Sequence, residues 1–358
     1  MTFTIIDNGL CNKAGHHYSF DKMLVEADPT IKVLGMRNMS QAILSEGWAE
    51  GALTDWTYAN KPEWIDTFID FSEMFCGDLL YPLRYIQGPI LIHTSNPWII
   101  YGLAKYLIGI EGSLAVKIIL CLPGIRDENG NPTLQAVLYA KAIRELRKWG
   151  GKFEIAVQTE WTIADGTVCG IMPSICPTFP LHQVEPKGVE DAPVFGFLGH
   201  SNGVKGLSLL LQAAQLTPEI QYFCQLNPVL ANPIGLPNVK VIEGELNDRY
   251  YTDTLSKMDA VVLPYNRDYY KNHMSAVFLE SICSGRPVII PADTWMEFEA
   301  KRLGVGYESF ESGSAASLLM AIRAMRDKWP EAHTKSIAAL QTVREKYNVN
   351  RFIKWVES

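Results

Sequence analysis

Short runs of β-branched and aromatic residues alternate with longer stretches of helical periodicity along almost the whole chain. This alternation is typical of βαβ units, in which parallel strands form one sheet and the connecting helices cover its two faces. In the first half we expect strands at 3–7, 30–35, 89–94, 114–122 and 153–158, and helices at 16–27, 62–80, 97–110 and 132–149. The pattern therefore predicts an α/β fold built on parallel sheets.

The alternation is interrupted between residues 169 and 188, where the chain contains four prolines and two glycines. Because proline fits neither a helix interior nor a central strand, we place a domain boundary there. A chain of 358 residues also exceeds the roughly 250 to 300 residues at which a single core stops growing. We expect two domains, 1–178 and 179–335, and a C-terminal helix, 336–358, that packs back toward the first domain.

The βα alternation resumes after the boundary and predicts a second doubly wound domain. We expect strands at 194–199, 221–226, 239–244, 260–264 and 287–291, and helices at 207–215, 248–258 and 275–283. No sequence period of roughly 20 to 50 residues recurs, which excludes a solenoid. Two Rossmann-like domains that face each other across a cleft are the expected architecture.

Composition excludes several classes of protein. The net charge of −7 excludes a general nucleic-acid binder, because such proteins carry a basic surplus. Polar residues interrupt the apolar stretch 89–110, and no basic and apolar leader pattern opens the chain, so we expect neither a membrane span nor a signal peptide. The seven cysteines lack Cys-x-x-Cys or Cys/His spacing, so we expect free thiols, a cytoplasmic location and no metal site.

A glycine-rich loop follows the expected strand 194–199 and leads into an apolar helix. Gly199, Gly203 and Gly206 let the backbone approach a ligand closely, and Lys205 adds a positive charge beside the free N–H groups of the helix start. These features predict an anion site. The alternative is an ordinary βα turn with a solvated lysine, and the absence of a Gly-Lys-Ser/Thr order excludes a Walker loop.

A second loop follows the expected strand 260–264 and precedes a helix that begins at Ser275. Loops after parallel strands open onto the edge of the sheet where ligands bind, and the helix start suits a diphosphate. Glu280 stands among apolar neighbours, so its carboxylate needs a partner or a ligand hydroxyl, unless it reaches solvent. The tyrosines at 265, 269 and 270 either stack on a base or sugar or pack internally.

The segments KGLSLLLQAA, DAVVLPY and SAVFLESICSGRPVI, within residues 194–291, resemble the donor domain of GT-B glycosyltransferases of the retaining family 4 type. The resemblance implies that Lys205 and the N–H groups of Ser275 and Ala276 meet the donor diphosphate, and that Glu280 meets the ribose. The full expected donor set is Gly199, His200, Lys205, Tyr265, Tyr270, Asn272, Ser275, Ala276 and Glu280.

The chain departs from this family pattern at two positions. Asn272 stands where the family often has a second glutamate, eight positions before the ribose-binding one, and His200 stands where a basic residue commonly follows the loop glycine. A subset of similar enzymes has a Tyr-x-x-x-x-Ser loop there, which Tyr270 to Ser275 matches. These departures leave the identity of the donor sugar open.

The first half resembles the acceptor domain of such enzymes less closely. Gly15, His16 and His17 follow the first strand, where imidazoles meet acceptor hydroxyls or the departing phosphate, and His93 ends a strand at the edge where a family residue touches the transferred sugar. The alternatives are helix-capping histidines and a satisfied core histidine. The basic helix at 139–150 predicts peripheral contact with a membrane, or else a solvated helix face.

Together these features predict a metal-independent, retaining glycosyltransferase in which Lys205, Glu280 and His93 act in catalysis. We expect the donor to be a nucleoside diphosphate sugar of the UDP or GDP type, with no further cofactor. We expect the acceptor to be a glycan, a lipid-linked molecule or another hydroxyl compound, as in polysaccharide biosynthesis. The alternatives are a non-catalytic GT-B-like subunit that binds a sugar or a partner, and a nucleotide-sugar epimerase.

Overall fold

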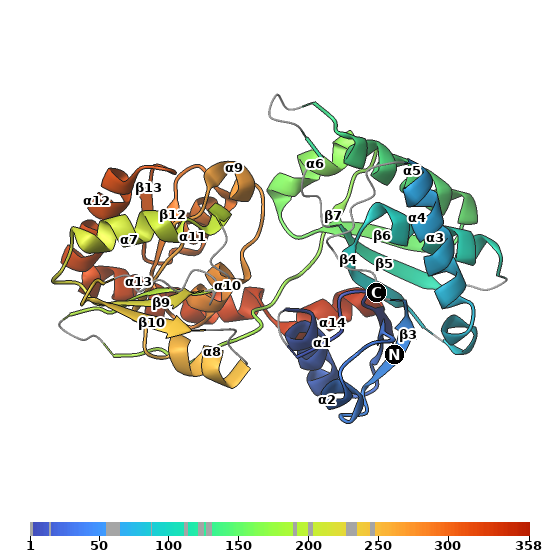
Figure 1. Ribbon diagram of the computed structural model, residues 1–358, viewed down its shortest axis with the longest axis horizontal. Helices are drawn as coiled ribbons and strands as arrows, with labels where there is room; N and C mark the ends of the chain where they lie inside the picture. Colours follow the sequence, from blue (N-terminus) through green and yellow to red (C-terminus); the bar gives the residue numbers. More distant parts are fainter. Residues whose placement is uncertain are drawn as a thin grey trace. The chain divides into compact units, whose positions relative to one another are not determined.

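The computed structural model describes residues 3–13, 16–54, 65–86, 88–110, 114–120, 125–126, 131–188, 192–199, 203–226, 235–243 and 248–358. The chain forms two compact units, each with its own sheet (Figure 1). The first unit comprises Met1–Thr178 and Val349–Ser358, and the second comprises Phe179–Asn348. No helix in these described ranges is long and apolar enough to cross a membrane.

The first unit is a parallel sheet with helices on both faces. Its strands are β1 (Thr4–Ile6), β2 (Lys32–Met36), β3 (Ala49–Leu53), β4 (Ile90–Ser95), β5 (Ala115–Leu120), β6 (Lys152–Val157) and β7 (Ser174–Ile175), in the order β3-β2-β1-β4-β5-β6-β7. Its helices are α1 (His16–Ala27), α2 (Gln41–Leu44), α3 (Ile65–Leu79), α4 (Pro97–Ile108), α5 (Leu134–Trp149), α6 (Ile163–Val168) and α14 (Val349–Glu357), with short 3-10 turns at Pro82–Tyr85 and Glu160–Thr162. Helix α4 packs between α3 and α5, whereas α1 packs against α14. Right-handed crossovers place these two groups on opposite faces of the sheet.

Helix α14 closes the core of the first unit although it is distant in sequence. Phe352 is 1% exposed and meets the Phe20 ring edge-on, with 5.5 Å between the ring centroids. The buried Lys117 of β5 pairs with Glu154 of β6, and its ammonium lies 5.2 Å from the ring of Trp355. Trp355 Nε1 also donates to Glu154, so the last helix is fixed by both apolar and polar contacts.

Replacing Phe352 by Ala is expected to destabilise the first unit. The substitution removes a buried aromatic ring and leaves a cavity beside Phe20, so the free energy of unfolding should fall by about 3 kcal/mol. Urea denaturation would measure the change. Lys354→Ala, at an exposed position of the same helix, is the matched control, and an equal effect of the two substitutions would contradict the role of Phe352.

The second unit repeats the architecture. Its strands are β8 (Phe195–Phe197), β9 (Tyr222–Leu226), β10 (Val239–Glu243), β11 (Ala260–Val262), β12 (Val288–Pro291) and β13 (Tyr307–Phe310), all parallel, in the order β10-β9-β8-β11-β12-β13. Its helices are α7 (Leu207–Gln215), α8 (Asp248–Leu255), α9 (Arg267–Tyr270), α10 (Ala276–Cys283), α11 (Trp295–Leu303), α12 (Ala315–Asp327) and α13 (Trp329–Lys346), with a 3-10 turn at Gly203–Lys205. Helix α7 packs on α12, and α13 packs on α10 and α11.

Each sheet has one point at which the strand order reverses. In the first unit β1 lies between β2 and β4, and in the second unit β8 lies between β9 and β11. Ligands of open α/β sheets bind outside the carboxyl ends of the strands at such a switch point. The loops after β1, β4, β8 and β11 are therefore the places where a functional site is expected.

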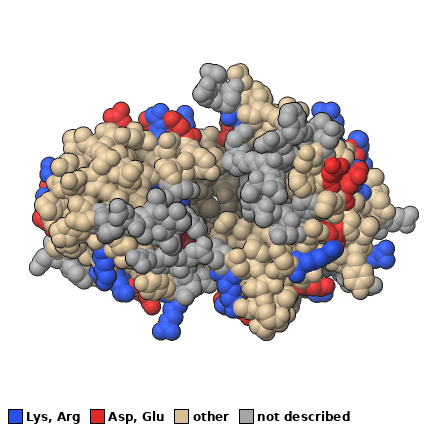
Figure 2. Space-filling view, in the orientation of Figure 1, with Lys and Arg blue, Asp and Glu red and all other residues tan. Residues whose placement is uncertain are grey.

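Charged side chains are mixed on the surface shown in Figure 2. Lysine and arginine side chains lie among aspartates and glutamates on this face, without a continuous basic stripe over the residues that the figure colours. A nucleic-acid-binding surface would instead gather basic side chains along one path. The coloured residues of this face therefore carry both signs of charge side by side.

Candidate functional site

The first loop of the second unit brings the Lys205 ammonium over the backbone of Gly199. Gly199 has a φ of +94°, and a Cβ at this position would lie only 2.6 Å from Lys205 Nζ and 3.6 Å from Val277 Cγ2. Glycine is required there both by the backbone conformation and by the space that the ammonium occupies. Since Val277 belongs to the first turn of α10, the ammonium lies beside the start of that helix.

The Lys205 ammonium is held in a partly dehydrated position. Its Nζ lies 5.8 Å from the centroid of the Tyr265 ring, and it makes no hydrogen bond or ion pair with the residues described in the structure. Burial lowers the pKa of Lys205, and the carboxylate of Glu280 partly opposes this effect. A dehydrated cation without a bound anion is suited to a negatively charged ligand.

Backbone contacts join the two loops of the switch point. The N–H of Asn266 donates to the carbonyl of Val204 at 2.8 Å. Gly206, with a φ of +66°, lies so close to Pro264 that a Cβ would meet the Pro264 carbonyl oxygen at 1.9 Å. The loop that carries Lys205 is therefore fixed against the loop that leads to α10.

Helix α10 begins at this junction with a capped N-terminus. The Ser275 hydroxyl accepts from the N–H of Phe278 at 3.3 Å, which leaves the N–H groups nearer the helix start for a ligand. The aligned peptide dipoles add partial positive charge at this end. Tyr265 is fully buried and its ring centroid lies 4.3 Å from that of Tyr270, while Tyr270 and Asn272 are half-buried at the surface of the loop.

Glu280 is 3% exposed and does not reach solvent, so that alternative is wrong. Its Oε2 accepts a hydrogen bond from the Tyr251 hydroxyl at 2.5 Å, and the ring of His182 lies against Tyr251 with 4.5 Å between the centroids. Burial and the Glu280 carboxylate raise the pKa of Tyr251 well above its usual value, so the phenol stays protonated and donates. The sequence analysis missed Tyr251, because its contact with Glu280 spans 29 positions.

In the first unit, the switch point gathers two histidines and two aspartates. His17 Nδ1 lies 2.7 and 2.8 Å from the two oxygens of Asp7, which directly follows β1. His93 Nε2 of β4 lies 3.4 Å from Asp7 Oδ2 and 3.1 Å from Oδ1 of Asp21 on α1. All four residues are buried, and Asp7, His17 and His93 each place one ligand atom within 4.8 Å of the others. The sequence analysis singled out the histidines but neither aspartate.

The pKa of each group in this cluster depends on the charges of its neighbours. Although burial opposes ionisation, His17 and His93 hold the pKa of Asp7 well below its usual value. Burial and the nearby Asp7 raise the pKa of Asp21 to about 8, against the opposing effect of His93. Although burial opposes it, Asp7 and Asp21 raise the pKa of His93 to about 10.

The remaining expected positions are Gly15, His200, His16 and the basic helix α5. Gly15 and His200 fall outside the residues that the structure describes. His16 is exposed, and its ring centroid lies 4.3 Å from that of His17. On the basic helix α5, Lys148 pairs with Glu145, and Arg147 donates to the carbonyl of Gly170. Two of the basic side chains of α5 therefore already have partners within the first unit.

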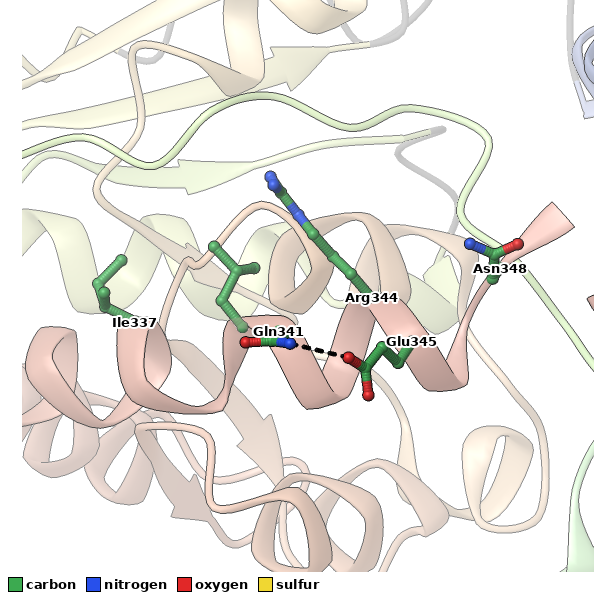
Figure 3. Close-up of a pocket in the computed structure, with 6 residues that line it drawn as sticks. Ile337, Gln341, Arg344, Glu345 and Asn348 are labelled. Atoms are coloured by element: carbon green, nitrogen blue, oxygen red, sulfur yellow. Dashed lines mark hydrogen bonds between the residues drawn. The ribbon is translucent and has the colours of Figure 1, made fainter. Parts of the chain in front are cut away.

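A pocket of about 440 Å³ lies elsewhere, along α13 (Figure 3). Its lining residues are Ile337, Leu340, Gln341, Arg344, Glu345 and Asn348. Gln341 Nε2 donates to Glu345 Oε1 within this set, and Arg344 donates to the carbonyls of Cys283 and Val184. None of the lining residues belongs to the loops after β8 or β11, so the pocket is separate from the switch point.

No model of a known protein family matches the chain, and no curated protein matches its sequence. Solved structures do match the fold. Sucrose-phosphate synthase from Thermosynechococcus elongatus is 13% identical with a TM-score of 0.71, covering 99% of this chain and 97% of that one. Anabaena HepE in complex with UDP and glucose is 13% identical with a TM-score of 0.69, covering 100% and 98%. A glycosyltransferase from Rickettsia africae is 9% identical with a TM-score of 0.67, covering 99% and 96%.

These similarities extend over the whole chain. Together with the two parallel sheets, they show that the protein has the GT-B fold, so the predicted α/β architecture with two Rossmann-like units is confirmed. The predicted roles of individual site residues remain predictions.

Proposed function

We propose that this protein is a glycosyltransferase that transfers a sugar from a nucleoside diphosphate sugar to an acceptor hydroxyl. The observation that carries the proposal is the partly dehydrated Lys205 ammonium, which lies over Gly199 beside the start of α10. Burial lowers the pKa of Lys205, and the Glu280 carboxylate of the same helix partly opposes this effect. A cation and a helix N-terminus at one switch point suit a diphosphate. HepE, which shares the fold, has been solved with UDP and with UDP-glucose.

In this proposal each group of the second unit has a chemical role. Lys205 and the N–H groups of Ser275 and Ala276 bind the diphosphate and stabilise the negative charge that develops on it as the sugar leaves, so no metal is required there. The carboxylate of Glu280 accepts from ribose hydroxyls. Tyr270, backed by the buried ring of Tyr265, forms an aromatic wall for the base or sugar, beside Asn272 and the backbone of Gly199.

The first unit takes the acceptor, which is a glycan, a lipid-linked molecule or another hydroxyl compound. The exposed imidazole of His16 is placed to meet it, at the carboxyl edge of the sheet. The resemblance to family 4 enzymes supports retention of the anomeric configuration and a donor of the UDP or GDP type. The cysteine pattern supports a cytoplasmic enzyme, and the basic side chains of α5 support peripheral contact with a membrane.

A panel of nucleotide sugars, incubated with the full chain and analysed by mass spectrometry, tests this function. A glycosyltransferase releases the nucleoside diphosphate from one donor and transfers the sugar to an acceptor or to water. Binding of a nucleotide sugar without release of the nucleoside diphosphate would favour the non-catalytic subunit. Asn272, in place of a family glutamate, supports this alternative. Conversion of the donor into an isomer would favour an epimerase.

Replacing Tyr251 by Phe is expected to weaken nucleotide binding while leaving the fold intact. The phenol fixes one oxygen of Glu280, so its loss frees the carboxylate and should raise the Kd for the nucleoside diphosphate about tenfold, or about 1.4 kcal/mol. Calorimetric titration would measure the Kd. Tyr250→Phe, at the exposed neighbouring position, is the control. Equal affinities of the two variants would show that Tyr251 does not position Glu280.

A further inference from the structure

The four-residue cluster at the switch point of the first unit has a chemistry that the donor site does not use. We infer that His17, His93 and Asp7, with Asp21 as a fourth ligand, form a binding site for a divalent transition-metal ion of the zinc class. The site lies entirely within the first unit, whereas the proposed diphosphate chemistry uses groups of the second. The inference therefore goes beyond the proposed function and does not depend on it.

The spacing of the donor atoms fits one small metal ion. Donor atoms that bind a metal tetrahedrally at about 2.1 Å lie roughly 3.4 Å from one another. In the structure, Asp7 Oδ2 lies 2.8 Å from His17 Nδ1 and 3.4 Å from His93 Nε2, and Asp21 Oδ1 lies 3.1 Å from His93 Nε2. The donor atoms of Asp7, His17 and His93 all lie within 4.8 Å of one another, and Asp21 adjoins this group through His93. Three secondary-structure elements, β1, α1 and β4, supply them.

Polar atoms without hydrogen bonds lie in the same buried place. Asp21 is 0% exposed, and neither of its oxygens makes a hydrogen bond to a residue that the structure describes, although Oδ1 lies within ion-pair distance of His93. The side chain of Asn8, next to Asp7, is also buried at 2% exposure and makes no hydrogen bond in the same residue set. Buried carboxylates and amides normally find partners, so atoms of this kind indicate a place where a ligand binds.

The donor set selects the class of metal. Two imidazole nitrogens with carboxylate oxygens suit zinc and neighbouring transition metals, whereas calcium and magnesium prefer oxygen ligands. The outer contacts orient the ligands as metal sites require. His93 Nδ1 lies 3.0 Å from the Thr94 hydroxyl, which turns Nε2 toward the carboxylates, and the N–H of Gly9 donates to Asp7 Oδ1 at 2.8 Å.

A metal ion at this position would join the carboxyl ends of β1 and β4 to the first turns of α1. Because the ion binds the folded unit and the separated ligands of an unfolded chain bind it less well, it should raise the thermal stability. It would also fix the edge of the sheet beside the exposed His16. The metal ion would thus stabilise the part of the first unit that would contact the acceptor.

The test measures metal content and affinity on the full chain. Protein stripped with a chelator is dialysed against micromolar zinc chloride, its zinc is counted by mass spectrometry, and the Kd is measured by calorimetry. The expected result is one zinc ion per chain and a raised Tm. Cobalt(II) in place of zinc should give the visible absorption of a four-coordinate site. A wild-type chain that retains no stoichiometric zinc would overturn the inference. It would mean that hydrogen bonds between the imidazoles and the carboxylates hold the cluster together without a metal ion.

Variants separate this site from adventitious binding. His93→Gln, which preserves volume, and His17→Ala should each lower zinc affinity by at least roughly 100-fold and remove the cobalt spectrum. His16→Ala, at the exposed neighbouring position, should retain both. Unchanged zinc binding in both ligand variants would place the metal elsewhere and refute the assignment. If a ligand variant fails to fold, the stoichiometry and cobalt spectrum of the wild-type chain decide the question.

Discussion

Replacing Lys205 by Ala is expected to lower donor turnover by roughly 100- to 1000-fold, the usual loss when one preorganised group that stabilises developing charge is removed. The ammonium lies over Gly199 at the start of α10, where the leaving diphosphate gathers negative charge in our proposal. At this partly dehydrated position a single charge attracts an opposite charge more strongly than it would in water. Steady-state release of the nucleoside diphosphate would measure the loss as kcat.

A second variant separates the charge of Lys205 from its packing. Lys205→Met keeps most of the side-chain volume beside Gly199 but removes the ammonium, so its turnover should fall as far as that of the alanine variant. Burial lowers the pKa of Lys205, which means that the folded state disfavours the charged form when no anion is bound. The methionine variant should therefore unfold at the same or a higher temperature than wild type.

The control for both variants is Lys257→Ala, at an exposed lysine of the same unit. It should leave donor turnover and Tm unchanged. Turnover by Lys205→Ala that equals that of Lys257→Ala would remove Lys205 from the site and would contradict the proposed diphosphate contact. A strong loss of stability in Lys205→Met would instead show that the lysine is structural.

The regular elements could be predicted where apolar periodicity is strong. Helices α1 and α7 begin and end at the expected residues, and α10 begins one residue after the expected Ser275. Strand β3 was not predicted, because Ala49–Leu53 contains three residues of low β propensity and a glycine. It forms at the sheet edge by pairing with β2, and pairing of this kind is a tertiary effect that the local sequence does not show.

The last stretch of the chain was predicted only in part. Val343, Tyr347, Phe352 and Ile353 are buried, whereas Leu340 and Trp355 are half-buried. The expected single segment 336–358 is divided by a break after Lys346, so that α13 belongs to the second unit and only α14 belongs to the first. Both helices are amphipathic, and periodicity alone does not tell which core each apolar face covers.

The same limit applies to the candidate sites. Glycine and helix-start patterns placed the two loops of the second unit, because these signals are local. The partner of Glu280 and the aspartates around His93 come from other elements, so only the fold brings them together. One local signal was available for Asp21, since it lies four residues after His17 and therefore on the same helix face.

Among substitutions that add one methyl group to the donor site, Gly206→Ala should damage the site most. Residue 206 has a φ of +66°, which costs a non-glycine residue about 1 to 3 kcal/mol, and the new Cβ would meet the Pro264 carbonyl oxygen at 1.9 Å. The loop carrying Lys205 must therefore move away from the loop leading to α10. We expect the free energy of unfolding to fall by about 3 kcal/mol, and nucleotide binding to be lost.

Gly203→Ala is a matched control in the same loop, because Gly203 opens the 3-10 turn and, chain neighbours apart, no atom of the described residues lies within 4 Å of a Cβ at residue 203. Urea denaturation would compare the stabilities of the two variants, and calorimetric titration with a nucleoside diphosphate would compare their affinities. If close contact between the two loops creates the anion site, only the substitution at residue 206 should abolish binding. Binding that survives Gly206→Ala unchanged would show that Lys205 and α10 act without this contact.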